Sequence, residues 1–163
     1  MIELLFLAVG MLVLVFSFVL LFGAPYLPTL SKQAEAALDL VDLKPGQHLL
    51  ELGCGDGKVM IAAAKRGIRV TGYELNPILA AIAWIRTRRF GRQVKVVCGN
   101  FWTIKLPVTD GIFVFLLPKY MAKLDTKIVQ ESRKPVKLVS FAFRIPKKKI
   151  SSESQGVFLY AYK

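Results

Sequence analysis

The most informative stretch of this chain is His48-Leu49-Leu50-Glu51-Leu52-Gly53-Cys54-Gly55-Asp56-Gly57. A short apolar run ends in a loop with glycine at every second position, and an apolar helical pattern follows it. The glycines at 53, 55 and 57 let the backbone turn sharply and let a ligand approach main-chain N–H groups without a Cβ in the way. The stretch therefore predicts a strand, a ligand-binding turn and a helix of an α/β sheet.

A second apolar run ends in an acid. Residues 69–73 lead into Glu74, 17 residues after Gly57. In doubly wound α/β sheets, an acid at the tip of the second strand binds the hydroxyl groups of a ribose. We therefore expect a nucleoside-containing cofactor at the carboxyl edge of a parallel sheet.

The loop excludes two common nucleotide sites. Lys58 stands where the dinucleotide fingerprint G-x-G-x-x-G requires its third glycine, and no Gly-Lys-Ser/Thr closes a P-loop. A pyrophosphate would also favour an acid-free loop, whereas this loop carries Glu51 and Asp56. Those acids suit a cationic ligand. S-adenosylmethionine, with its sulfonium, its α-ammonium and its ribose, fits the pattern.

From Glu51 to Gly57 the chain resembles the class I S-adenosylmethionine-dependent methyltransferases, whose first motif reads acid-x-Gly-x-Gly-x-Gly. The likeness to one family within that class is closer. It resembles the small membrane-associated protein-lysine methyltransferases, whose eukaryotic members act in mitochondria on membrane carriers and on components of the ATP synthase. The segments that carry this resemblance are residues 25–29, 51–58, 62–65, 72–77, 101–102 and 160–162.

The resemblance implies a Rossmann-like fold, a methyl-transfer activity and a set of cofactor-binding residues. Glu74 is expected to accept both ribose hydroxyls, with Leu75 against the adenine. Asn100 takes a place where the family usually has an aspartate that reads the adenine amino group, and Phe101 with Trp102 covers the adenine or belongs to the core. The residues expected around the methionine half are Glu51, Gly53, Cys54, Gly55, Asp56 and Gly57.

Methyl transfer from a sulfonium is an in-line displacement, so holding the nucleophile and the methyl group in line supplies most of the rate. A lysine acceptor must first lose a proton, which desolvation beside the cationic sulfonium favours. Residues 116–120 lack the Asn/Asp-Pro-Pro-Tyr motif of DNA and glutamine methylation, which argues against those acceptors. Candidates for the acceptor pocket are Tyr26, Thr29, Tyr120 and Phe143.

Two alternatives remain beside a protein-lysine methyltransferase. One is methylation of a lipophilic small molecule, such as a quinone precursor or a lipid. The other is a cofactor-binding scaffold without catalysis, which Asn100 and the short C-terminal part motivate.

The first 23 residues predict a single transmembrane anchor. Residues 4–22 are apolar apart from Gly10 and Ser17, and Glu3 is the one charge before Lys32. Nineteen helical residues span about 28 Å, close to the thickness of a bilayer core. A signal peptide or a buried helix is the alternative. Since basic residues follow the span and none precedes it, a spanning anchor places the following domain in the cytoplasm.

The chain carries a formal net charge of +12. Its basic residues cluster at residues 86–95 and 144–149, and beside a membrane anchor they are expected to face anionic lipid headgroups. A solvated basic face is the plain alternative, and no recognition motif supports nucleic-acid binding. Cys54 and Cys98 show no pairing logic, and a single histidine, His48, argues against a metal site. His48 is interpreted as a strand-edge residue rather than a catalytic base.

Residues 24–30 read as a linker and 31–163 as one cofactor-binding domain. Helices are predicted at 31–41, 58–66, 78–90 and 118–133, and strands at 47–52, 69–74, 94–98, 111–117, 137–143 and 156–162. Strands that alternate with helices predict a mainly parallel sheet. Only one strand follows the fifth, where the full class I fold has a hairpin, and 151–155 reads as a polar loop. The C-terminal part of the sheet is therefore expected to be reduced.

Overall fold

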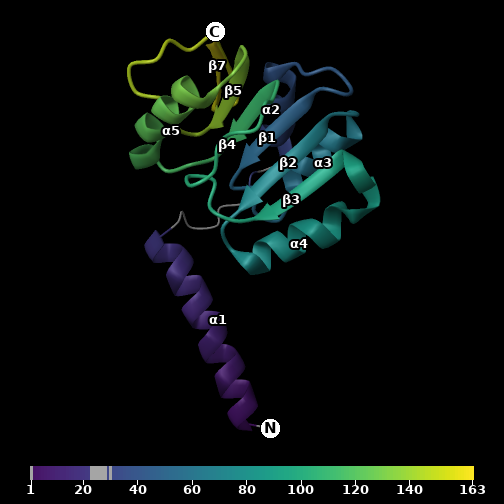
Figure 1. The fold of residues 1–163 in the computed structure, drawn as a ribbon, viewed down its shortest axis with the longest axis vertical. Helices are drawn as coiled ribbons and strands as arrows, with labels where there is room; N and C mark the ends of the chain where they lie inside the picture. Colours follow the sequence, from purple (N-terminus) through teal and green to yellow (C-terminus); the bar gives the residue numbers. More distant parts are fainter. Residues whose placement is uncertain (1, 23–28, 30) are drawn as a thin grey trace.

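A computed structural model describes residues 2–22, 29 and 31–163 (Figure 1). Its main body is a seven-stranded sheet with helices on both faces. The strands are β1 (His48–Leu52), β2 (Arg69–Glu74), β3 (Val94–Cys98), β4 (Gly111–Val114), β5 (Val136–Phe141), β6 (Ser152–Ser154) and β7 (Val157–Tyr162). The helices are α1 (Ile2–Phe22), α2 (Ser31–Val41), α3 (Lys58–Lys65), α4 (Pro77–Thr87) and α5 (Pro118–Glu131), with a 3₁₀ segment at Arg88–Gln93.

The strand order is β3-β2-β1-β4-β5-β7-β6. Strands β1 to β5 are parallel, and β7 is antiparallel both to β5 and to β6. The order reverses between β1 and β4, which is the place where ligands bind in open α/β sheets. The predicted Rossmann-like fold with a mainly parallel sheet is confirmed.

The two faces of the sheet are covered differently. On one face, α2, α3 and α4 pack against β-strand residues such as Leu49, Val70 and Phe113. On the other face, α5 packs its Met121 and Leu124 over the central strands. Within the described residues, the connections 99–110 and 142–151 hold no helix. Irregular chain from these two connections shares the second face with α5.

The C-terminal part of the sheet is more complete than expected. Residues 151–155 do not form a plain loop, because Ser152–Ser154 make strand β6, which pairs with β7 as a hairpin. A three-residue edge strand leaves one side to water, so a polar segment without hydrophobic alternation can form it. That is why the hydrophobic pattern alone missed β6, and the prediction of a missing hairpin was wrong.

Helix α1 is 21 residues long and contains the predicted apolar run. Its described side chains, such as Leu4 and Phe6, are largely exposed. Among the residues that the structure describes, no helix meets the combined length and apolarity needed to cross a membrane. The structure therefore does not support the predicted transmembrane helix. The linker predicted at residues 24–30 lies outside the described residues except for Thr29.

Candidate functional site

The glycine loop is held to the neighbouring strand by its own backbone. The N–H groups of Gly53 and Cys54 both donate to the carbonyl oxygen of Tyr73 in β2, at 2.9 Å each. Gly53 and Gly55 adopt φ angles of 87° and 53°, which side chains disfavour. The loop thus turns directly over the carboxyl end of β2, as the sequence predicted.

Gly72 in β2 makes room for this loop. A Cβ added at Gly72 would lie 2.8 Å from Cβ of Cys54 and 2.6 Å from Sδ of Met60. In contrast, a Cβ added at Gly53 would meet no atom of the described residues within 4 Å. The loop is therefore packed tightly against β2 on one side and open on the side of Gly53, where a ligand has access.

Glu74 lies beside the loop, as the spacing predicted. Its Oε2 accepts a hydrogen bond from the Gly55 N–H and its Oε1 accepts one from the Asn76 N–H, both at 2.8 Å. A carboxylate offers about four acceptor positions, so each oxygen keeps one for a further donor. The buried carboxylate is thereby oriented at the carboxyl edge with capacity for two hydroxyl groups.

Glu51, at the end of β1, is buried, and its Oε2 has no hydrogen-bond partner among the residues that the structure describes. Burial, followed by the negative charges of Asp56 and Glu74, raises the pKa of Glu51 well above its ordinary value, and only the Met60 N–H opposes this. The Oε2 atom thus lacks a donor within the described residues, and none of the causes of the raised pKa is a nearby cation. An ammonium group brought beside Glu51 would supply both the charge and the missing hydrogen bond.

Asp56 makes a contact that the sequence did not reveal. Its carboxylate is ion-paired with Arg86 of α4, and the Arg86 guanidinium also donates to the Asp56 carbonyl oxygen at 3.1 Å. The pair joins the glycine loop to α4 across 30 residues of sequence, and no local pattern signals it. The expected role of Asp56 toward the methionine half of the cofactor stays a prediction.

Asn76 is a second residue whose role the sequence analysis missed. Its Oδ1 accepts from the N–H groups of Ile78 and Leu79, which caps α4, and its Nδ2 is buried without a partner. The Asn-Pro pair at 76–77 is a typical helix start, so this cap could have been found from sequence. The cap fixes the backbone N–H that orients Glu74.

The residues predicted to face the adenine lie at the same edge. Leu75 is half-buried, directly after Glu74. Asn100 is exposed after β3, and its Oδ1 accepts from the Trp102 N–H at 3.0 Å, so the side chain stabilises its own turn. Phe101 is 9% exposed and belongs to the apolar cluster under α5. The structure thus gives Phe101 a core contact, and the Asn100 amide oxygen is engaged in its own turn, so the expected role of Asn100 toward the adenine stays a prediction.

Four aromatic side chains, called the aromatic group below, follow β3, β4 and β5 or lie in the first turn of α5, and they form two ring pairs. The rings of Trp102 and Tyr120 are 6.0 Å apart, and the rings of Phe115 and Phe143 are stacked at 6.2 Å. Tyr120 and Phe143 were predicted from the sequence, whereas Phe115 was not, because within a strand pattern it reads as core. Lys123 and Lys119 place their ammonium groups 4.6 and 4.9 Å from the ring centres of Trp102 and Tyr120.

Two other acceptor candidates are not placed in this group. Tyr26 lies outside the described residues, and Thr29 is buried. Both cysteines are free, with Cys54 buried and Cys98 exposed. Burial, followed by the charges of Glu51 and Glu74, raises the pKa of the Cys54 thiol, so this side chain stays protonated in the loop.

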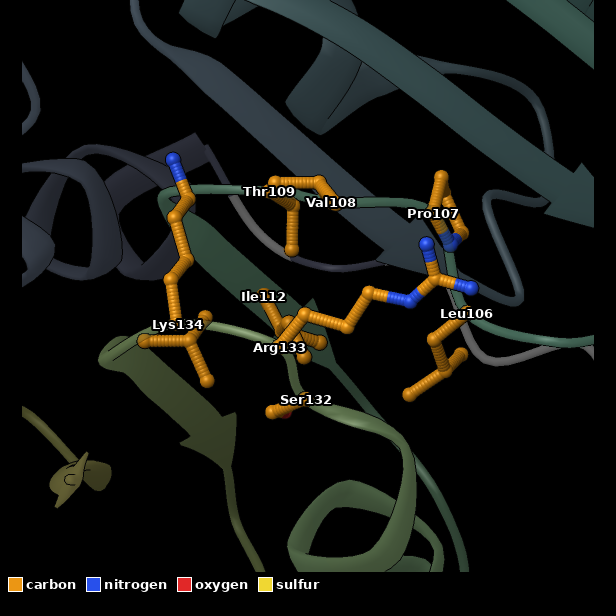
Figure 2. A pocket seen from close by; sticks show the side chains of 9 residues that line it. Leu106, Pro107, Val108, Thr109, Ile112, Ser132, Arg133 and Lys134 are labelled. Atoms are coloured by element: carbon orange, nitrogen blue, oxygen red, sulfur yellow. The ribbon is translucent and has the colours of Figure 1, made fainter.

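His48 lies at the opposite edge of the sheet. Its Nε2 is 2.9 Å from Oγ1 of Thr71, and its Nδ1 is 3.3 Å from the Val108 carbonyl oxygen. The interpretation of His48 as a strand-edge residue is confirmed. Figure 2 shows a pocket near this edge, where Thr109 and Ile112 of the β4 side meet Ser132 and Lys134 before β5. Its volume of about 10 Å³ suits one water molecule rather than a cofactor.

Residues 51–152, from the glycine loop to β6, match the family described as the ANTKMT methyltransferase domain. The chain belongs to this family. The match begins at Glu51 and includes Glu74 and the aromatic group, so the site described above lies within the family's domain.

Named relatives agree with the family. The adenine nucleotide translocase lysine N-methyltransferase of Mus musculus is 33% identical over 125 residues, which are 75% of this chain and 54% of that protein. A protein-lysine N-methyltransferase of Saccharolobus islandicus (strain REY15A) is 30% identical over 148 residues, 83% of this chain and 92% of that protein. The chain thus spans about half the length of the mouse relative and nearly all of the second.

A solved structure supports the fold. An RNA methyltransferase from Salinibacter ruber, in complex with S-adenosyl-L-homocysteine, has a TM-score of 0.75 and 24% sequence identity to this chain. The alignment covers 83% of this chain and 92% of that structure. The class I methyltransferase fold that the sequence predicted is confirmed, with the complete sheet described above.

Proposed function

We propose that this chain is an S-adenosylmethionine-dependent methyltransferase that methylates lysine side chains of a membrane or membrane-adjacent protein. The observation that carries the proposal is the pairing of Glu74 with the glycine loop. One carboxylate, at the carboxyl end of β2, accepts the N–H groups of Gly55 and Asn76 and keeps capacity for two hydroxyls. It does so in a sheet of the methyltransferase family.

The residues present fit this cofactor. Glu74 offers acceptors for a ribose diol, and the unpartnered Oε2 of Glu51 offers a place for an α-ammonium group. The open side of Gly53 lets a ligand reach the loop. When bound, S-adenosylmethionine supplies an electrophilic methyl group on its sulfonium. The role of this chain is then to hold the cofactor at one half of the carboxyl edge and the acceptor at the other.

The aromatic group at β4 and β5 suits a lysine acceptor. Ring faces attract ammonium groups, and the chain's own Lys119 and Lys123 already lie over Tyr120 and Trp102. Apolar rings also desolvate an amine, which lowers its pKa and favours the neutral form that can attack a methyl group. We therefore assign Trp102, Phe115, Tyr120 and Phe143 to the acceptor side.

The first test is transfer of a tritiated methyl group. The full chain in detergent is incubated with labelled S-adenosylmethionine and with membranes from a strain that lacks this protein. We expect label in a protein band, located on lysine by mass spectrometry. Glu74→Ala should strongly reduce the label at a limiting cofactor concentration. Glu153→Ala, at an exposed position paired with Arg144, is the matched control and should keep it.

The other outcomes separate the alternatives. Label that appears only in the organic extract would identify a lipid or quinone acceptor and would reject the lysine assignment. Cofactor binding in calorimetry without transfer to any membrane fraction would support the non-catalytic scaffold. No binding of the cofactor at all would reject the assignment of the glycine loop.

We also propose that the first 23 residues anchor the domain to a membrane, with the domain on the cytoplasmic side. The sequence supports this proposal, because residues 4–22 carry no charge and basic residues follow the run. Cys98 is exposed and Cys54 buried, so a membrane-impermeant maleimide reports the location of Cys98. We expect labelling in inverted but not in right-side-out vesicles, and release of the protein by alkaline carbonate would contradict the anchor.

A further inference from the structure

Helix α4 has apolar side chains on two sides. Its inner side, with Leu79, Ala80 and Ala83, is buried against the sheet and α3. Its outer side carries Ile82, Trp84 and Ile85, which are 39%, 59% and 54% exposed. A surface helix normally has polar residues on its solvent side, and a helix that is apolar all round is normally buried. The outer side of α4 therefore lacks the partner that its composition requires.

The same segment is strongly basic. Residues 75–98 contain five basic side chains and no Asp or Glu. Arg86 is paired with Asp56, whereas Arg88, Arg89, Arg92 and Lys95 are exposed and form no ion pair within the described residues. In the second basic cluster two of the four basic residues are ion-paired, Arg144 with Glu153 and Lys148 with Asp125. Unpaired positive charge thus gathers next to the exposed apolar side chains.

We propose that the outer side of α4 docks on the surface of an anionic lipid bilayer. In this arrangement Ile82, Trp84 and Ile85 enter the boundary between headgroups and acyl chains, and the arginines of residues 88–92 contact lipid phosphates. Tryptophan favours this boundary because its ring is apolar and its N–H is polar. A helix with apolar residues beside several arginines has the composition of helices that lie in the plane of a membrane surface.

Charge distinguishes a bilayer from the other partners of an apolar surface. A symmetric dimer through α4 would bring two copies of the same unpaired arginines together, which is unfavourable. A nucleic acid would satisfy the arginines but would leave Ile82 and Ile85 without an apolar partner. An anionic bilayer satisfies both sets of side chains.

This docking surface deepens the membrane part of the proposed function and is independent of methyl transfer. Helix α4 begins at Pro77, three residues after Glu74, so a membrane along α4 adjoins the edge that holds the cofactor site. An N-terminal anchor attaches the domain to the membrane at one end of the chain. A docked α4 fixes its orientation, which restricts the acceptor to lysines near the headgroup plane.

The fluorescence of Trp84 tests the proposal in the full chain. Trp102→Phe leaves Trp84 as the only tryptophan and keeps an aromatic ring at position 102. The protein is reconstituted in phosphatidylcholine vesicles with or without phosphatidylglycerol, and brominated acyl chains quench any tryptophan that enters the bilayer. We expect a blue shift and quenching of Trp84 with phosphatidylglycerol, and weaker effects with phosphatidylcholine alone or at high salt.

Matched variants distinguish docking of α4 from attachment through the N-terminus and from the effect of the total positive charge. Arg89→Gln with Arg92→Gln should lower the docking equilibrium about 30-fold, since each basic residue near an anionic surface contributes about a factor of five. Lys147→Gln with Lys149→Gln removes the same charge from the second cluster and should change little. Ile85→Asp should abolish quenching, whereas Val129→Asp, at an exposed position of α5, should preserve it.

Trp84 that remains unquenched in every lipid composition would overturn the proposal, even if the chain stays on the vesicles through its N-terminus. A blue shift that depends on protein concentration without lipid would overturn it in favour of self-association. The fluorescence requires neither cofactor nor acceptor, so a failure of methyl transfer leaves this result interpretable. Conversely, loss of docking does not test cofactor binding, which is measured in detergent.

Discussion

The two edges of the parallel sheet differ in whether their polar groups are hydrogen-bonded. At the amino edge, Asp110 accepts from the His48 N–H at 2.7 Å and from Lys134 Nζ at 2.5 Å, and Thr109 Oγ1 donates to the His48 carbonyl oxygen. At the carboxyl edge, Glu51 Oε2 and Asn76 Nδ2 are buried and have no partner in the part of the chain that the structure describes.

A protein gains stability by pairing its buried polar groups, and each unpaired group costs free energy. The paired groups of the amino edge stabilise the fold. At the carboxyl edge, in contrast, the buried Glu51 carboxyl group costs free energy because its Oε2 is not hydrogen-bonded. The difference indicates that the carboxyl edge is shaped for a ligand rather than for the empty protein.

The largest expected effect comes from closing the space under the glycine loop. Gly72→Ala would place a Cβ 2.8 Å from Cβ of Cys54, which cannot move without the loop. We expect the free energy of unfolding to fall by about 1–3 kcal/mol and cofactor binding to be lost. Calorimetry and thermal denaturation measure both. Gly99→Ala is the control, since a Cβ there meets no atom within 4 Å. Equal behaviour of the two variants would show that the loop is not held as described.

Glu74→Ala should have the next largest effect on binding. The variant loses the acceptors for the ribose and leaves the Gly55 and Asn76 N–H groups without their partner. We expect the affinity for S-adenosylmethionine to fall by about 1–3 kcal/mol, measured by isothermal calorimetry. An affinity like that of the wild type would remove Glu74 from the ribose assignment.

Glu51→Gln should separate stability from binding. In the empty protein, burial and the charges of Asp56 and Glu74 raise the pKa of Glu51, so folding favours its protonated form. Its contribution to stability is complete below the ordinary pKa of about 4.5 and is lost as pH rises toward the folded-state pKa. The glutamine variant should therefore be more stable than the wild type at neutral pH, with a difference that shrinks toward pH 4.5.

Cofactor binding should change in the opposite direction. A neutral amide cannot pair with an α-ammonium group as a carboxylate does, so the affinity for S-adenosylmethionine should fall by about tenfold or more. An ammonium group favours the charged carboxylate and so lowers the raised pKa of Glu51, and wild-type binding should therefore release protons at pH values above 4.5. Calorimetry in buffers of different ionisation enthalpy detects this release. If the Glu51→Gln variant is less stable and binds S-adenosylmethionine with unchanged affinity, Glu51 stabilises the fold, as Asp110 does at the amino edge, and does not bind the cofactor.

The cofactor half of the site could be predicted from sequence because the backbone demands particular residues there. Turns with φ near 53° and 87° require glycine at 55 and 53, and the acid at 74 follows a strand whose end is evident. The helix cap at Asn76 is equally local, and an Asn-Pro pair is enough to find it.

The acceptor half could not be predicted in the same way. Aromatic residues such as Phe115 and Phe143 fit a core as well as a pocket, so only their position at the carboxyl edge distinguishes them. The Asp56–Arg86 pair and strand β6 depend on contacts between distant segments or on a sheet edge, and neither leaves a periodic signal. The exposed apolar side of α4 could not be predicted either, because the sequence shows an apolar helix but does not show which of its sides the sheet covers.

The smallest effect is expected at the amino edge, from Asp110→Ala. Burial works to raise the pKa of Asp110, but hydrogen bonds from Lys134 and the His48 N–H outweigh it, and the pKa is lowered. The stabilising contribution of Asp110 is therefore present above its ordinary pKa and is lost as pH falls below about 3.8. We expect the variant to lose about 1–2 kcal/mol of stability at neutral pH.

The affinity for S-adenosylmethionine should not change in this variant, because Asp110 lies before β4, at the edge opposite the glycine loop. Thermal denaturation and calorimetry on the same sample give both values. If Asp110→Ala lowers the free energy of unfolding but not the affinity for S-adenosylmethionine, and Glu51→Gln lowers the affinity but not the free energy of unfolding, the two edges of the sheet serve separate purposes. If Asp110→Ala lowers both the stability and the affinity, the amino edge also positions the cofactor site, through β1 and β4.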